Sequence, residues 1–238
     1  HVSPDGDAVG TMLGIYHFLR AIGKQAIQCA LHDPVPKIYT WMPGAENVMR
    51  PDAIKGTWDL TVVVDVARRE RIGKVADFVP EGSNVLVLDH HIEDSPMGTN
   101  YFIDTSYAAA GEIVVDLFQA ANVPLTRDAA ICAYVGLMTD TGGFRFNNTS
   151  PASHRRAATL LEAGIDVLDI SSRVYDSISL PKFRLLGIAL GRMVVAEDAP
   201  YAYTYVTESD MRDAGATGED LEGIVNYPRS IEGVEVAL

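Results

Sequence analysis

Short runs of β-branched and other apolar residues alternate with helical patterns through residues 1–175. Three runs are bounded by Gly, Pro or Ser and predict strands over residues 24–31, 59–66 and 83–91. In the second and third runs the apolar residues follow one another almost without interruption. Such runs are typical of strands that are covered on both faces in a parallel sheet.

Apolar residues recur at helical spacing in further segments, which predict helices over 7–23, 110–122, 126–140 and 150–164. Gly23 and Gly164 follow the last periodic residue of two of these segments, where a helix commonly ends. Ser150 and Pro151 suit the N-cap and the first helical position. The alternation of strands and helices predicts an α/β fold with an open, mainly parallel sheet flanked by helices.

The pattern changes after about residue 178. Segments 191–198 and 201–208 predict two strands joined in a hairpin through "DAP". We therefore expect a first domain over residues 1–178 and a linker over 175–186. Residues 187–238 are expected to begin a smaller α/β domain that is incomplete at its C-terminus.

Composition narrows the function classes. The 238 residues are 47% hydrophobic and carry a formal net charge of −13, which argues against a protein that grips long nucleic acid through a basic surface. The two cysteines lack C-x-x-C spacing and fit a reducing, cytoplasmic compartment. The longest apolar run, 129–138, is too short to span a bilayer. Because the chain starts at His1 without Met and directly at a motif, we expect residues upstream of it.

Acidic and histidine side chains come from four separate segments, each placed where a strand or a helix of the predicted fold begins or ends. They are Asp5 with Asp7, Asp65, the run Asp89-His90-His91, and Asp140. In an open α/β sheet, ligands collect beyond the carboxyl ends of the strands, so we expect these side chains to converge at one edge.

Each group also has a purely structural interpretation. Asp5 and Asp7 suit the capping of the helix that follows them, and Asp65 suits an ordinary loop. Neighbouring residues of a strand face opposite ways, so of His90 and His91 one is expected to point at the site and the other beside it.

Mixed Asp and His ligands without Cys favour a hard-to-borderline divalent cation, with Mn²⁺ first and Mg²⁺, Co²⁺ or Zn²⁺ as alternatives. The set exceeds what one catalytic ion needs. Two ions bridged by a carboxylate would accommodate it and would offset the repulsion among the acids.

The motifs resemble those of a known superfamily. "HVSPDGDAVG" (1–10), the strand end at Asp65, "LDHH" (88–91) and "TDTGGFRF" (139–146) are similar to the four successive motifs of DHH phosphoesterases. "TDTGGFRFNNTSP" and "GIVNYPRSIEGVEVAL" (223–238) resemble the branch of bifunctional oligoribonucleases (nanoRNases) and 3′-phosphoadenosine-5′-phosphate phosphatases.

The resemblance implies a role for each residue of the four motifs. His1 and Asp5 would bind one metal ion, Asp7, His90 and Asp140 the other, and Asp65 both. Asp89 would orient a ligand, while His91 would hold the scissile phosphate or assist the leaving oxygen. Arg145 would contact phosphate, although a surface or packing role suits it equally. Arg229 in "YPRS" is a weak substrate candidate. The family's first strand and its Gly-rich nucleotide loop do not occur in the chain.

The expected activity is metal-dependent hydrolysis of short RNA oligomers, one nucleotide at a time in the 3′-to-5′ direction, and of 3′-phosphoadenosine-5′-phosphate. Four alternatives stay open: a linear-dinucleotide phosphodiesterase, a RecJ-type single-strand exonuclease, a manganese-dependent pyrophosphatase and a non-catalytic nucleotide-binding domain. The expected partners are short oligoribonucleotides or a nucleoside bisphosphate, not long duplexes or membranes. Whether the protein forms a homodimer is left open.

Overall fold

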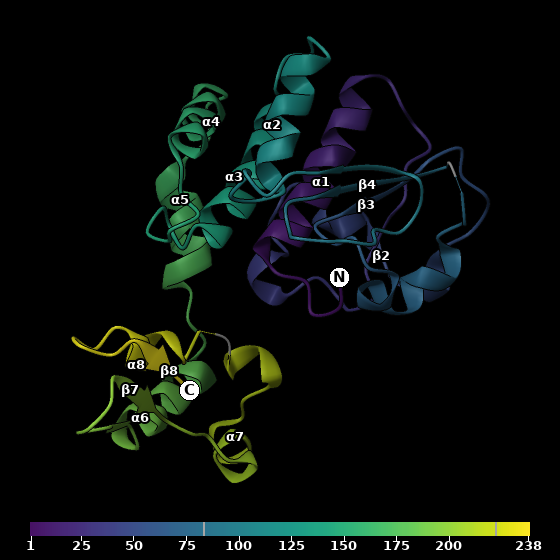
Figure 1. The fold of residues 1–238 in the computed structure, drawn as a ribbon. Coiled ribbons are helices and arrows are strands. Elements are labelled where there is room, and N and C mark those ends of the chain that lie inside the picture. The colour runs from purple at the N-terminus through teal and green to yellow at the C-terminus, as the bar shows by residue number, and fades with distance from the viewer. Residues whose placement is uncertain (83, 222) are drawn as a thin grey trace. The chain divides into compact units, whose positions relative to one another are not determined.

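The computed structural model describes residues 1–82, 84–221 and 223–238, with the side chain of Glu219 left out. The chain divides into two compact units, His1–Val174 and Tyr175–Leu238, and each is described by itself. Figure 1 shows the elements of both units. None of the helices in these described ranges has the length and apolar character needed to cross a bilayer.

Parallel strands form the sheets of the first unit. β3 (Thr61–Val64), β4 (Val85–Asp89) and β5 (Asn100–Ile103) form one parallel sheet in the order β3-β4-β5. β1 (Cys29–Ala30) pairs in parallel with β2 (Val48–Met49). The α/β class with parallel strands is therefore confirmed. The pattern analysis did not find β2 or β5, because β2 has only two residues and β5 lies at a sheet edge with most of its residues exposed.

The predicted strand over 24–31 shortens to Cys29–Ala30. This strand lines an apolar cavity of about 500 Å³ together with residues of α1 and β3. His1 is one of the lining residues. The parallel strands of the first unit therefore form two sheets, and β1 and β3 line this cavity.

The four predicted helices of the first unit are confirmed. They are α1 (Gly6–Ala21), α2 (Gly111–Ala120), α3 (Arg127–Asp140) and α4 (Pro151–Glu162), followed by the short α5 (Val167–Ser171). Ser150 forms a capping box with Ser153 at the start of α4. Short 3₁₀ segments cover Lys37–Tyr39, Ala45–Asn47, Pro51–Ala53 and Arg69–Phe78, and one π-turn covers Ser172–Asp176.

α1 and α3 pack against each other very closely (Figure 1). A Cβ at Gly10 would stand 2.4 Å from the carbonyl oxygen of Cys132, so only glycine fits there. Val9, Leu13 and Leu137 are fully buried in the core that these helices share with α2. This close contact brings the start of α1 beside the end of α3.

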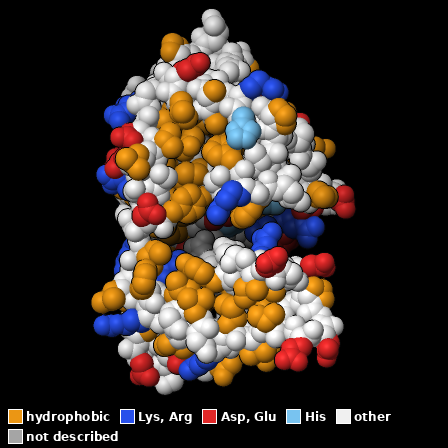
Figure 2. Space-filling model, turned by 90° about the vertical axis from the view of Figure 1, so that its left-hand side faces the viewer, with side chains coloured by type: hydrophobic (Ala, Val, Ile, Leu, Met, Phe, Trp, Pro, Cys, Tyr) orange, Lys and Arg blue, Asp and Glu red, His pale blue; other side chains and the backbone are white. Residues whose placement is uncertain are grey.

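The second unit is a small α/β unit. Its elements are α6 (Leu180–Gly191), β6 (Val194–Val195), β7 (Tyr201–Tyr203), α7 (Glu208–Ala214), the 3₁₀ segment Gly218–Leu221, α8 (Asn226–Arg229) and β8 (Val236–Ala237). β6 and β7 pair antiparallel, which confirms the hairpin, and β8 joins β7 in parallel. Hydrophobic side chains gather on the face of this unit that is visible in Figure 2.

The segment 175–186, predicted as a linker, is largely helical instead. α6 begins at Leu180, because the side chain of Ser179 accepts a hydrogen bond from the Lys182 amide and Pro181 follows at the start of the helix. Leu185 and Ala189 of this helix are buried in the core of the second unit. The unit boundary lies at Val174/Tyr175, before this helix.

Candidate metal centre

The loop before α1 carries two of the predicted ligands. Asp5 is the N-cap of α1, and its Oδ1 accepts a hydrogen bond of 3.0 Å from the Ala8 amide. Its other oxygen, Oδ2, lies 3.6 Å from Nε2 of His1. Helix capping and a site at His1 are therefore compatible, because each uses one oxygen of the same carboxylate.

Asp7 is fully buried, and its direction is set by groups about a hundred residues away. The Ala110 amide donates to Oδ2 at 2.6 Å, and the Gly111 amide donates to Oδ1 at 2.8 Å. The hydroxyl of Thr11 also donates to Oδ1, at 2.9 Å. Both amides come from the start of α2, where unpaired N–H groups favour a negative charge.

Asp65 lies between two groups of ligands. It follows β3 directly, is 1% exposed and has a φ of +57°, in the left-handed region. Its Oδ2 is 3.4 Å from Nε2 of His1, and its Oδ1 is 3.5 Å from Nε2 of His90. The two oxygens of one carboxylate thus face two different histidines.

His90 lies at the centre of a second group of predicted ligands. Its Nε2 lies 3.2 Å from Oδ2 of Asp140 and 3.6 Å from Oδ2 of Asp7. Asp140 is the last residue of α3, so it reaches the site from the end of a helix and not from a strand. The structure therefore brings together all six predicted metal ligands.

His91 and Asp89 form a pair beside these groups. Oδ1 of Asp89 accepts hydrogen bonds from the amides of His90 and His91 and lies 2.8 Å from Nδ1 of His91. The rings of His90 and His91 lie side by side, with centroids 4.3 Å apart. This placement agrees with the expectation for the two histidines, because Nε2 of His90 lies among the predicted ligands and His91 lies beside them on Asp89.

The electrostatics of the site call for positive charge. Burial raises the pKa of Asp7 well above its ordinary value, and the charges of Asp65 and Asp140 raise it further. The neighbouring acids Asp5 and Asp65 raise the pKa of His1 to about 10. Burial lowers the pKa of His90, but Asp140 and Asp65 outweigh it and raise that pKa to about 11. A bound cation would offset the repulsion among these crowded carboxylates.

Two buried polar atoms of the site have unused ligand capacity, which bears on whether these residues suit metal ions. Oδ1 of Asp65 and Nε2 of His90 have no hydrogen-bond partner among the described residues. Ligand atoms of His1, Asp5 and Asp65 lie within 4.8 Å of one another, as do those of Asp7, His90 and Asp140. Buried polar atoms are normally paired, so unpaired carboxylate and imidazole atoms that converge in this way fit metal coordination.

The two predicted substrate arginines belong to different units of the chain. Arg145 is exposed on the loop after α3, and its Nε donates to the carbonyl oxygen of Gly142 at 2.7 Å. Arg229 ends α8 in the second unit. Their roles stay predictions.

Several residues that shape the site carry no chemical signal in the sequence. Thr11, Ala110 and Gly111 hold Asp7, and Gly136 lies against it. Small residues in a row, as at 108–111, were the only available sign of a close approach. Neither their partners nor their distance from Asp7 follows from the sequence.

Residues 1–137 match the family described as "DHH family, N-terminal domain". The chain belongs to the DHH family. A bifunctional oligoribonuclease and PAP phosphatase NrnA from Thermus thermophilus is 34% identical over 239 residues, which cover all of this chain and 69% of the relative. The protein of the same name from Bacillus subtilis is 25% identical over 237 residues, covering 98% of the chain and 73% of the relative.

A solved structure supports the same assignment. An exopolyphosphatase-related protein from Bacteroides fragilis aligns with a TM-score of 0.90 and 30% identity, over 98% of this chain and 72% of that one. The fold class and the resemblance to DHH phosphoesterases are thus confirmed. The chain is a hydrolase of a metal-dependent phosphoesterase family, and it has acidic and histidine groups that suit a metal ion.

Proposed function

We propose that this DHH phosphoesterase hydrolyses very short RNA oligomers, one nucleotide at a time from the 3′ end, and 3′-phosphoadenosine-5′-phosphate. We place it in the cytoplasm, which suits its two free, buried cysteines. The names of the Thermus and Bacillus relatives support both substrates. The net charge of −13 supports short substrates, because long polymers need extensive phosphate neutralisation by basic residues.

The placement of Asp65 between two ligand groups carries the proposal. One ion would be held by His1, Asp5 and Asp65, and the second by Asp7, Asp65, His90 and Asp140. Mn²⁺ suits this mixture of carboxylate and imidazole ligands, with Mg²⁺, Co²⁺ and Zn²⁺ as competitors. A pair of such ions supplies an activated water near neutral pH and stabilises charge on phosphoryl oxygens.

The residues around the metal ligands would position the substrate. Asp89 fixes the ring of His91 through Nδ1, so Nε2 remains available to a phosphoryl oxygen. The side chain of His91 is 48% exposed, whereas that of His90 is only 10% exposed. We assign His91 to the scissile phosphate, Asp89 to the orientation of His91, and Arg145 and Arg229 to further substrate phosphates.

A substrate panel with Mn²⁺ tests the proposal. Ribodinucleotides, five-mers, long single strands, 3′-phosphoadenosine-5′-phosphate, linear dinucleotides of signalling pathways and pyrophosphate would be compared at equal concentration. We expect turnover of dinucleotides, five-mers and the bisphosphate, and loss of at least about 100-fold in Asp65→Asn. Hydrolysis of pyrophosphate alone, or nucleotide binding without turnover, would contradict the proposal.

A further inference from the structure

A buried carboxylate next to the metal centre has no part in the reaction just described. Glu112 lies in the first turn of α2 and is fully buried. Its Oε2 accepts a hydrogen bond of 3.0 Å from the Ala108 amide, while Oε1 has no partner among the described side chains and backbone groups. Burying a carboxylate is costly, so its contacts indicate what it is used for.

One contact anchors Glu112 to α4. Nη1 of Arg156 lies 3.4 Å from Oε2 of Glu112. The same guanidinium donates to both oxygens of Asp116, at 2.9 and 2.5 Å, and lies 4.3 Å from the centre of the Tyr107 ring. Arg156 is therefore held in place by Asp116 and Tyr107, and it holds Glu112 in turn.

The other contact ties Glu112 to the turn that grips Asp7. Glu112 binds the amide of Ala108, and the next residues in the chain supply the Ala110 and Gly111 amides that donate to Asp7. Nδ2 of Asn148 donates to the carbonyl oxygens of both Ala108 and Asp140, at 3.0 Å each. The turn 108–111 is thus fastened by Glu112 on one side and by Asn148 on the other.

The direction of Asp7 depends on this turn. Oδ1 of Asp7 is occupied by Gly111 and Thr11, whereas Oδ2 accepts only from Ala110 and is the oxygen that faces His90. A shift of the Ala110 amide would therefore move the oxygen that is aimed at the cation. We propose that Glu112, anchored by Arg156, is a positioning residue for the cation site formed by Asp7, His90 and Asp140.

This inference rests on the proposed metal-dependent function, and Mn²⁺ binding tests it. In Glu112→Ala we expect the affinity of one Mn²⁺ site to fall by about 10- to 100-fold, while the site at His1 and Asp5 keeps its affinity. Glu112→Gln should restore most of the loss, because its amide oxygen still accepts from Ala108. Free Mn²⁺ would be counted by electron paramagnetic resonance during titration.

A second variant covers the case in which Glu112→Ala does not fold. Asn148 is exposed, so Asn148→Ala should fold, and we expect it to weaken the same site by about 10-fold. A matched control is Asp169→Ala, which removes another first-turn carboxylate paired with an arginine, Arg173 on the next turn. This control should leave both Mn²⁺ affinities unchanged.

Amide hydrogen exchange of the metal-free protein separates the two proposals. We expect the amides of Ala110 and Gly111 to exchange about 10-fold faster in Glu112→Ala, or in Asn148→Ala, than in the wild type. Wild-type Mn²⁺ affinities in both Asn148→Ala and folded Glu112→Ala, or equal losses at both sites, would overturn the positioning role alone. A wild-type protein that binds no Mn²⁺ would overturn the proposed function instead, and the exchange rates would still report whether Glu112 holds the turn.

Discussion

Gly136 of α3 lies so close to Asp7 that a Cβ at position 136 would stand 2.5 Å from Oδ1 of Asp7. Real Cβ atoms do not approach a neighbour that closely, so either Asp7 or α3 would have to shift. Because Asp7 is also held by the amides of Ala110 and Gly111, the carboxylate is confined on several sides. A glycine in the middle of α3 is therefore needed for the observed position of the Asp7 carboxylate.

Gly136→Ala should therefore damage the site. Replacing a helical glycine by alanine normally stabilises by about 0.5–1 kcal/mol, but here we expect a loss of about 1–3 kcal/mol from overpacking. Mn²⁺ affinity should also fall by at least about 10-fold. Gly187→Ala in α6 is the control, because a Cβ there would meet nothing within 4 Å. Urea unfolding would measure the free energy of unfolding, and titration would measure the Mn²⁺ affinity. Equal changes of these two quantities in Gly136→Ala and Gly187→Ala would contradict the packing argument.

Mn²⁺ should stabilise the folded protein. The metal-free site confines several acids at close range, and a ligand that binds only the folded state raises its stability by mass action. At a hundred times the dissociation constant the gain is about 2.7 kcal/mol, or roughly 5–10 °C in Tm. Differential scanning fluorimetry with Mn²⁺ and then EDTA would measure the shift.

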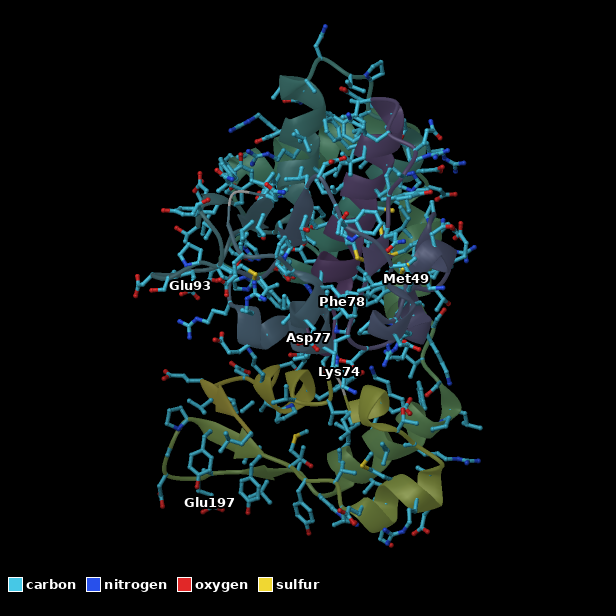
Figure 3. The ribbon with its side chains drawn as sticks, turned by 90° about the vertical axis from the view of Figure 1, so that its right-hand side faces the viewer. Met49, Lys74, Asp77, Phe78, Glu93 and Glu197 are labelled. Atoms are coloured by element: carbon cyan, nitrogen blue, oxygen red, sulfur yellow. The ribbon has the colours of Figure 1, made fainter. Side chains whose placement is uncertain are left out.

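Asp65→Asn should remove most of that shift while the protein still folds, because asparagine tolerates the left-handed φ of +57° at this position. Asp77→Asn is the control. Asp77 lies on the 3₁₀ segment Arg69–Phe78, is exposed and makes no ion pair among the residues described (Figure 3). An unchanged shift in Asp65→Asn would argue against a shared carboxylate.

His90 and His91 should differ in what they contribute. His91→Ala is expected to lower turnover by about 100-fold or more with Mn²⁺ affinity unchanged within about twofold, since its side chain is half-exposed and its Nδ1 lies nearer to Asp89, at 2.8 Å, than to Asp65, at 3.8 Å. His90→Ala should lower both, because its Nε2 lies among three carboxylates. Parallel measurement of kcat and Mn²⁺ affinity separates the two, and a loss of metal affinity in His91→Ala would make His91 a ligand.

The ion pair of Asp116 predicts a pH-dependent contribution to stability. Burial raises the pKa of Asp116, but hydrogen bonds from Arg156 and Tyr107 outweigh it, so its pKa in the folded state is lowered. A depressed carboxyl pKa stabilises the fold above the unfolded-state value of about 3.9, and this contribution disappears as the pH falls through the folded-state pKa. Asp116→Asn should therefore cost about 1 kcal/mol at pH 6–7, and the difference from wild type should shrink below about pH 4.

Urea unfolding between pH 3 and pH 7 would measure this difference. Asp77→Asn serves again as the control and should leave the free energy of unfolding close to that of the wild type, since no arginine is paired with Asp77 among the described side chains. A difference between Asp116→Asn and wild type that stays constant down to pH 3 would contradict the assignment.

Local patterns in the sequence were enough to predict the four longer helices of the first unit and the strands β3 and β4. α1 and α4 follow from helical periodicity and from their capping residues, and β3 and β4 follow from uninterrupted apolar runs. β5 was not found, because an edge strand with exposed residues has no such run. The pattern analysis predicts a linker over 175–186, which includes the first part of α6, although Ser179 and Pro181 mark the start of that helix.

The convergence of the six side chains proposed as metal ligands could also be expected from the sequence, since each lies near the end of an element or in a motif, and such ends meet at one edge of an α/β fold. The sequence of each motif states which side chains are present, and its position relative to the predicted elements states where along each element they lie. It therefore determines the chemistry that the chain can offer, because carboxylate and imidazole groups have the same ligand preferences in any fold.

Only the tertiary structure decided the orientation of these carboxylate and imidazole side chains. Asp7 is oriented by Ala110, Gly111 and Gly136, which are more than a hundred residues away and carry no chemical signal. The pairing of Glu112 with Arg156 likewise depends on how α2 and α4 pack against each other. Periodicity reports which face of an element is buried, but distances between elements follow from packing of the whole chain.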